Sequence, residues 1–275
     1  LIDNLSSHNI GNSDDVVLHR SKYYDYNKFF QIYYFNLIKD FINNHNICFE
    51  IGAGYGALAE IIIKNKNTKY FVVDLPESNI LTAYYLNKCF PDKKIYLYDN
   101  YINNNRIVMS SDIEEFDIFI LPPNLKFEDS IHFDLFINAR SMMEMDMTTI
   151  NDYFNFIHKH SNEGTYFLNV NRYEKVTVGE SIRFSDYPYD PNWDVEISTQ
   201  AFKQKHIHLI LAKRKNNEGN IHKELIAVDK LGEEFYEKGF SFSRFKFLIQ
   251  KLILDIFGRK FLTSIIQLKR KLQGR

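Results

Sequence analysis

Apolar residues recur along the chain with two different periods. In residues 22–42 they follow one another at steps of three and four, which is typical of one face of an amphipathic helix. Similar patterns predict helices over 57–65, 77–90 and 148–161. Short apolar runs bounded by polar residues predict buried strands over 46–54, 69–76, 94–100, 116–124, 133–141, 164–172, 194–202 and 206–215.

The order of these elements predicts the fold class. Strands that are apolar on both faces and alternate with helices indicate an α/β fold, with a mostly parallel sheet covered by helices on both faces. The last two strands, which no helix separates, predict an antiparallel hairpin at the end of the sheet. We expect three regions: an N-terminal helical segment over 1–45, the main domain over 46–215, and a linker with a helical tail over 216–275.

Within the main domain, residues 172–195 are polar, aromatic and interrupted by Pro188 and Pro191. Long ordered loops of this kind often carry function, so we expect this loop to lie over an active site. The 275 residues are 45% hydrophobic and 25% charged, which is typical of a globular protein, and the net charge of −1 argues against nucleic acid as the partner. Two cysteines and no apparent signal peptide or membrane span favour the cytoplasm.

The tail differs from the rest in charge. Residues 240–275 contain nine lysines or arginines and one acidic residue, Asp255. Apolar residues fall on one helical stripe: Phe261, Ile265, Leu268 and Leu272. A basic amphipathic helix of this kind can lie on the inner, anionic face of a membrane. Docking on its own domain or on another subunit of a homo-oligomer is the favoured alternative.

The stretch FEIGAGYGALAEI, residues 49–61, predicts a strand, a glycine-rich turn and a helix. Such a turn lets the backbone approach a ligand, and the helix that follows offers free N–H groups. Gly52-x-Gly54-x-x-Ala57 with Asp74 fits a dinucleotide site, and the same turn fits S-adenosylmethionine. Glu50 favours the second, because a carboxylate at the end of a buried strand repels a pyrophosphate and attracts the ammonium group of S-adenosylmethionine.

EIGAGYG resembles motif I of the class I S-adenosylmethionine-dependent methyltransferases, and VVDLP resembles their second strand. The series LTAYYLNKCFP, FILPPN, FDLFINARSMMEM and YFLNVNR resembles the putative sugar O-methyltransferase family of surface-polysaccharide gene clusters, over residues 20–210. The resemblance implies a Rossmann-like fold with a seven-stranded sheet. It also implies methylation of a hydroxyl on a sugar or nucleotide-sugar precursor of capsule or O-antigen.

The resemblance further implies a set of cofactor contacts. Glu50 would hold the methionine ammonium group through water, and Asp74 would accept hydrogen bonds from both ribose hydroxyls, with Leu75 against the adenosine. The remaining contacts would be backbone approach at Gly52, Gly54 and Gly56, adenine packing by Pro122, Pro123 and Asn124, and Asn138 near the sulfonium. Because residues 92–116 are inserted, either Asp99 or Asn124 could face the adenine.

Acceptor chemistry is expected at the carboxyl ends of the parallel strands. Glu144, in an apolar segment, is the predicted general base, and the alternative is a carboxylate that caps the next helix. Arg172 is predicted to bind a phosphate of the acceptor, and the alternative is an ion pair with Glu174 or Asp194.

Several further residues are predicted to contact the acceptor: Ser141, Asn171, Tyr187 and Trp193. For the two aromatic residues, packing within the loop is an equal alternative. Asn169 and Asn171 could bind sugar hydroxyls or could simply be polar residues at the end of a strand. His206 and His208 alternate on one strand, but an ordinary strand face is favoured, so we predict no metal site. Alternative functions are methylation of a phosphate-type or lipid head group, a nicotinamide-dependent oxidoreductase, and a non-catalytic scaffold.

Overall fold

A computed structural model of the chain describes residues 6–7, 10, 16–19, 21–25, 28–123, 125–176 and 180–236. Residues 1–232 form one compact unit, and residues 233–275 are assigned to a second one. The predicted basic tail over 240–275 therefore lies outside the described residues. Within the described part of the chain, no helix is both long and apolar enough to cross a membrane.

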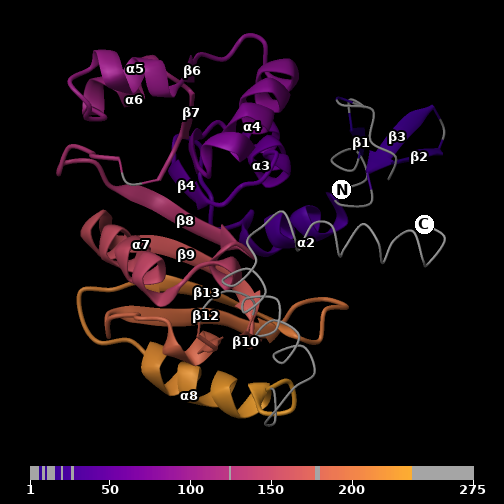
Figure 1. Ribbon diagram of the computed structural model, residues 1–275, viewed down its shortest axis with the longest axis vertical. Helices are drawn as coiled ribbons and strands as arrows, with labels where there is room; N and C mark the ends of the chain where they lie inside the picture. The colour runs from indigo at the N-terminus through magenta and orange to yellow at the C-terminus, as the bar shows by residue number, and fades with distance from the viewer. Residues whose placement is uncertain are drawn as a thin grey trace, which may run out of the picture. The chain divides into compact units, whose positions relative to one another are not determined.

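The compact unit is built on one large mixed sheet (Figure 1). Its strands, in spatial order, are β12 (Trp193–Gln200), β13 (Ile207–Arg214), β9 (Ser161–Arg172), β8 (Phe133–Ala139), β4 (Ile47–Ile51), β5 (Lys69–Val73), β7 (Ile118–Leu121) and β6 (Ile95–Tyr96). The pairs from β9 to β6 are parallel, whereas β13 pairs antiparallel with both β9 and β12. The predicted Rossmann-like α/β architecture is confirmed, with β6 as an eighth strand at the edge.

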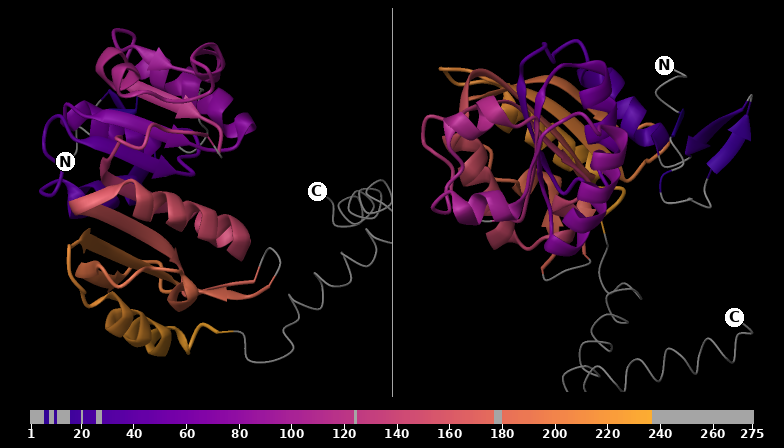
Figure 2. Two further views of the ribbon diagram at one scale, coloured as in Figure 1. Left: turned by 90° about the vertical axis from the view of Figure 1, so that its left-hand side faces the viewer. Right: turned by 90° about the horizontal axis from the view of Figure 1, so that it is seen from above.

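Helices cover both faces of this sheet (Figure 2). The longer helices in the strand connections are α3 (Ala57–Asn65), α4 (Pro76–Cys89) and α7 (Met147–Lys159). Helix α2 (Lys28–Ile38) precedes the first parallel strand. One face buries aliphatic side chains against α2 and α3. The other face is aromatic, where Phe49 and Phe133 lie with ring centroids 4.8 Å apart and Phe156 of α7 packs 4.9 Å from Phe49. Alternate strand residues point to opposite faces, so each strand supplies both layers.

The N-terminal segment is only partly helical. A small antiparallel sheet of β1 (Ser6–Ser7), β3 (Lys22–Asp25) and β2 (Val16–His19) precedes α2, so the helix expected over 22–42 is shorter than the pattern suggests. KYYD pairs with VVLH in a tight hairpin, in which His19 lies opposite Lys22, and helical periodicity does not register such cross-strand pairing. The buried Lys28 of α2 forms an ion pair with the buried Glu60 of α3 and attaches this segment to the main unit.

The inserted and terminal segments also form regular structure. Residues 92–116 contain β6, α5 (Tyr98–Asn103) and α6 (Ser110–Glu115). The expected loop over 172–195 contains β10 (Glu174–Lys175), β11 (Ile182–Arg183) and η2 (Phe184–Asp186), and η1 (Met142–Glu144) follows β8. Helix α8 (Ile221–Gly232) contacts β12 and η2, so the compact unit extends beyond residue 215, where the sequence suggested a linker.

Candidate cofactor and acceptor site

The glycine turn between β4 and α3 adopts a left-handed backbone. Gly52 and Gly54 have φ angles of 74° and 59°, a region that favours glycine. The N–H of Gly52 donates to the carbonyl of Val73 (2.8 Å), which ties the turn to the end of the neighbouring strand β5. The turn thus lies at the carboxyl edge of the sheet, where ligands bind in open α/β folds.

The glycines of this turn differ in what surrounds them. A Cβ atom on Gly52 would lie 2.2 Å from Cβ of Ser141, and one on Gly56 would lie 3.1 Å from Thr82 of α4. A Cβ on Gly54 would meet nothing within 4 Å. Gly52 and Gly56 are therefore needed for internal packing, whereas the open side of Gly54 is available to a ligand. The predicted backbone approach fits Gly54 best.

Glu50, at the end of β4, is the buried carboxylate of the site. It is 2% exposed, and Oε2 accepts a hydrogen bond of 2.8 Å from the hydroxyl of Tyr70 on β5. Burial raises the pKa of Glu50 to about 7, the Tyr70 hydrogen bond lowers it, and the charge of Asp74 raises it further. A carboxylate in this state gains from a cationic neighbour and is unfavourable beside a phosphate.

Asp74 follows β5 directly and faces the glycine turn. Its Oδ2 accepts from the N–H of Gly54 (2.8 Å) and its Oδ1 accepts from the N–H of Leu75 (2.7 Å). Each carboxylate oxygen keeps capacity for a further hydrogen bond, as two ribose hydroxyls would require. Leu75 is 61% exposed beside it, which leaves an apolar surface that an adenosine could cover.

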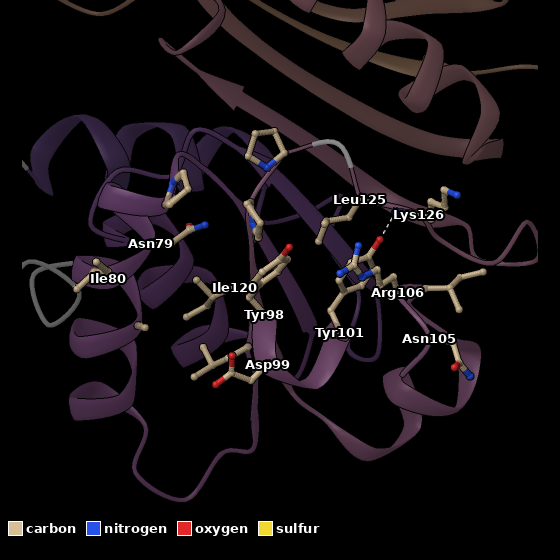
Figure 3. A pocket seen from close by; sticks show the side chains of 16 residues that line it. Asn79, Ile80, Tyr98, Asp99, Tyr101, Asn105, Arg106, Ile120, Leu125 and Lys126 are labelled. Carbon is tan, nitrogen blue, oxygen red and sulfur yellow. Dashed lines mark hydrogen bonds between the residues drawn. The ribbon is translucent and has the colours of Figure 1, made fainter. Parts of the chain in front are cut away.

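A pocket of about 1060 Å³ opens next to this acid, between α4, α5 and the end of β7 (Figure 3). Pro122 and Pro123 line it, as the predicted adenine contact requires, and so does Asp99 of α5. Asn79 of α4 also lines it and its buried Oδ1 has no hydrogen-bond partner, so an amino group of a ligand could donate to it. Asn124, the alternative to Asp99, lies outside the described residues.

Three asparagines form a buried network behind the glycine turn. Asn138 donates to the carbonyl of Ile51 (3.0 Å) and to Ser141, and it accepts from Asn171 (2.8 Å). Asn171 also donates to Asn169 (2.6 Å) and accepts from the N–H of Met143 (3.0 Å). All three asparagines are fully buried. Because the side chain of Asn138 is saturated, its contribution is to fix the turn and η1 and not to contact a sulfonium directly.

Ser141 belongs to the same network but is only half-buried. Its hydroxyl donates to the carbonyl of Ile51 (2.9 Å), directly beside Gly52. Asn171, which was predicted to contact the acceptor, is enclosed. The alternative, in which it is a polar residue at the end of a strand, describes it better.

Glu144 is the last residue of η1 and is exposed. The apolar environment expected from its sequence neighbours is absent because Met142 and Met143 point into the core. The capping alternative is not its role either, since Asp146 caps α7 by accepting from the N–H of Thr149 (2.8 Å). Glu144 is therefore an exposed carboxylate at the carboxyl edge of the sheet, and its side chain has no hydrogen-bond or ion-pair partner among the residues that the structure describes.

Arg172 ends β9 and is half-buried. Neither predicted ion pair forms: Asp194 instead pairs with Lys215, and Glu174 accepts from the hydroxyl of Ser181 (2.6 Å). The buried Nε of Arg172 has no hydrogen-bond partner. This nitrogen of the guanidinium group therefore keeps an unused donor.

The aromatic residues predicted to stack on a sugar are enclosed. Tyr187 is 4% exposed and packs on Phe184, and Trp193 is fully buried in β12 with the guanidinium of Arg214 over its ring. The packing alternative thus describes both, because the loop that carries them folds onto the antiparallel end of the sheet. Neither ring is accessible to an acceptor.

The two histidines do not share an environment. His208 is buried between the hydroxyls of Tyr173 (3.0 Å) and Ser198 (2.9 Å), and burial lowers its pKa to about 4. His206 precedes β13 and is exposed. Among the described residues, no group of three or more potential ligands could hold a metal ion.

Two site residues were missed from the sequence. Tyr70 binds Glu50, but only the β4–β5 register brings them to one face of the sheet. Tyr153 of α7 lies near Asp74: burial raises its pKa to about 12, and the charge of Asp74 adds to this. Tyr70 stands in an apolar run and Tyr153 in an amphipathic helix, so neither had a signal in the sequence beyond its polar hydroxyl.

No family model matches the sequence, and no curated protein matches it. Solved structures similar in fold include the pyocyanin biosynthetic protein PhzM, with a TM-score of 0.42 and 10% identity over 66% of this chain and 54% of that one. A TehB-like SAM-dependent methyltransferase from Corynebacterium glutamicum has a TM-score of 0.41 and 12% identity over 66% of this chain and 86% of its own.

A third similar structure is TrmK from M. capricolum, solved in complex with S-adenosylhomocysteine, with a TM-score of 0.41 and 12% identity over 68% of this chain and 70% of that one. The chain spans about half the length of PhzM. These likenesses carry no argument about function, so any function must be argued from the site itself.

Proposed function

We propose that this chain is an S-adenosylmethionine-dependent methyltransferase that methylates a hydroxyl of a sugar or sugar-derived precursor. The observation that carries the proposal is the buried Glu50, whose pKa is raised to about 7 at the edge of a glycine turn. This environment favours a ligand with an ammonium group and disfavours a pyrophosphate. A dinucleotide would bring two phosphates to the same turn.

The residues present fit S-adenosylmethionine in chemistry. Glu50 would hold the ammonium group, Asp74 would accept from the ribose hydroxyls, and the open face of Gly54 would let the backbone approach. The exposed Leu75 and the pocket lined by Pro122 and Pro123 would take the adenosine. The cofactor, when bound, supplies a methyl group on a sulfonium that an acceptor oxygen can displace in line.

The chain itself must position the acceptor and remove its proton. Positioning supplies a large part of the rate in such displacements. Glu144 remains the proposed base because it is an exposed carboxylate at the carboxyl edge of the sheet, on η1, which the asparagine network anchors beside the turn. The hydroxyl proton would pass to this carboxylate as the oxygen gains the methyl group.

The choice of a sugar hydroxyl rests on the sequence resemblance to the polysaccharide-cluster family. From the same resemblance we expect a small-molecule acceptor, a role in surface-polysaccharide biosynthesis and a cytoplasmic location. We also propose that the basic tail can contact the inner face of the membrane and that the chain can form a homo-oligomer. A phosphate-type or lipid head-group acceptor is the alternative.

A screen of acceptors tests the proposal. Purified full-length protein is incubated with S-adenosylmethionine and with nucleotide sugars, sugar phosphates or neutral sugars, and release of S-adenosylhomocysteine is measured. We expect release with at least one sugar-type acceptor. Asp74→Ala should weaken cofactor affinity by about tenfold or more, because a lost hydrogen bond to a ligand costs about 1–3 kcal/mol. Turnover only with lipid head groups would leave a methyltransferase but reject the sugar.

A further inference from the structure

Arg140 and Arg172 lie at the ends of adjacent parallel strands. Arg140 follows β8 directly and Arg172 ends β9, and the N–H of Arg140 donates to the carbonyl of Val170 on β9 (2.7 Å). Both residues are half-buried. Neither forms an ion pair with any residue that the structure describes, although most other half-buried cations of the unit, such as Lys69 and Arg214, are paired.

Two further side chains feel the charge of these arginines. Partial desolvation lowers the pKa of the exposed His206, and the charges of Arg172 and Arg140 lower it further, so the three side chains lie near one another. Burial raises the pKa of Tyr34 on α2 to about 12, and the charge of Arg140 acts against this rise. The hydroxyl of Tyr34 and the Nε of Arg172 are both buried, and neither has a hydrogen-bond partner.

The backbone at Arg140 is unusual. Its φ angle is 77°, in the left-handed region that disfavours residues with a Cβ atom. Glycine would adopt this conformation without strain, and strained residues of this kind are concentrated at ligand sites. The strain suggests that the guanidinium group, rather than the backbone, is what the position requires.

We propose that Arg140 and Arg172 bind a phosphate or diphosphate group of the acceptor. Guanidinium groups bind phosphate oxygens through paired, charge-assisted hydrogen bonds, which suits two arginines on neighbouring strands. The strands β8 and β4 are adjacent, so this phosphate site lies beside the glycine turn. The inference rests on the proposed function and specifies its acceptor as a phosphorylated sugar or a nucleotide sugar.

The test is a calorimetric titration of inorganic phosphate and of pyrophosphate into the full-length protein, with and without saturating S-adenosylhomocysteine. The variants are Arg140→Gly, which removes the guanidinium and relieves the backbone, and Arg172→Gln. Lys223→Ala, which removes an exposed cation of α8, is the control. We expect each arginine variant to weaken pyrophosphate binding by about tenfold or more, since charge-assisted bonds are lost, and the control to leave it unchanged.

Two readouts separate this inference from a structural role and from the proposed function. Thermal melting of Arg140→Gly should be unchanged or higher, because the strain is removed, so a loss of phosphate binding would not reflect unfolding. Affinity for S-adenosylhomocysteine should change by less than about threefold in both arginine variants. Unchanged affinity of both arginine variants for pyrophosphate would overturn the inference. A loss of affinity for S-adenosylhomocysteine alone would also overturn it, because it would assign the arginines to the carboxylate of the cofactor. Failure of the wild-type protein to bind S-adenosylhomocysteine would reject the proposed function, and the titration without it would still decide the phosphate site.

Discussion

The hydroxyl of Tyr70 on β5 donates a hydrogen bond of 2.8 Å to Oε2 of Glu50 on β4, inside the sheet core. Cys48 and Tyr70 are direct partners in the parallel pair, so Glu50 points to the same face two residues further on. One neutral hydroxyl is a weak partner for a buried carboxylate. The arrangement therefore disfavours the ionised form of Glu50 until a cation approaches.

The first prediction concerns stability in the absence of ligand. Burial raises the pKa of Glu50 from 4.5 to about 7, so the folded protein holds this proton more tightly than the unfolded chain does. The stability that comes from the protonated carboxyl is complete below the unfolded pKa and is lost as the pH rises through the folded pKa. Glu50→Gln should remove this loss and stabilise the protein at pH 8 by about 3 kcal/mol. Denaturant unfolding of both proteins at pH 4.5 and pH 8 measures it; a variant less stable at pH 8 would contradict it.

The second prediction is the pH dependence of ligand affinity. An ammonium group beside Glu50 favours the ionised carboxylate, so binding should release a proton below pH 7 and affinity should rise between about pH 5.5 and 7. Above the pKa of an α-amino group, about 8, affinity should fall again. Calorimetry with S-adenosylhomocysteine in buffers of different ionisation enthalpy counts the protons. In Glu50→Gln the rise between pH 5.5 and 7 should disappear, and its persistence would implicate another group.

The third prediction separates two glycines of one turn. In Gly52→Ala the new methyl group would overlap Ser141, where the Cβ distance is 2.2 Å, so we expect a loss of stability of about 2–4 kcal/mol. In Gly54→Ala the methyl group meets no protein atom and only the φ angle of 59° is unfavourable, at about 1 kcal/mol. Gly54→Ala should instead weaken cofactor binding. Melting curves and cofactor titrations of both variants test the contrast, and equal destabilisation would contradict it.

The fourth prediction concerns the base. Because Glu144 is exposed, Glu144→Gln should leave stability unchanged, but turnover should fall by about 10²–10⁴-fold if its carboxylate removes the acceptor proton. Asp146→Ala is the matched control, since it removes the cap of α7 and should cost about 1 kcal/mol of stability while turnover survives. The measurement is release of S-adenosylhomocysteine with the acceptor found by screening. A near-normal rate in Glu144→Gln would exclude it as the base.

Local patterns in the sequence predicted the sheet and its helices because each buried strand and each apolar helix face leaves a periodic signal. Glu50 and Asp74 could be singled out as candidates from the sequence because an acid at the end of an apolar run is unusual. The Tyr70 contact and the closeness of Arg140 to Arg172 depend on strand register and neighbour order, which no local pattern contains. The enclosure of Tyr187 and Trp193 depends on how the loop folds onto β12 and β13, and polar composition suggested exposure instead.

The most direct test of the central claim is a calorimetric comparison of S-adenosylmethionine, S-adenosylhomocysteine and NAD on the full-length protein at pH 7.5. If Glu50 selects an ammonium-bearing cofactor, the first two should bind and NAD should not, and Glu50→Gln should weaken the first two by about tenfold or more. Preferential binding of NAD, or equal affinity of wild type and Glu50→Gln for S-adenosylmethionine, would contradict the account.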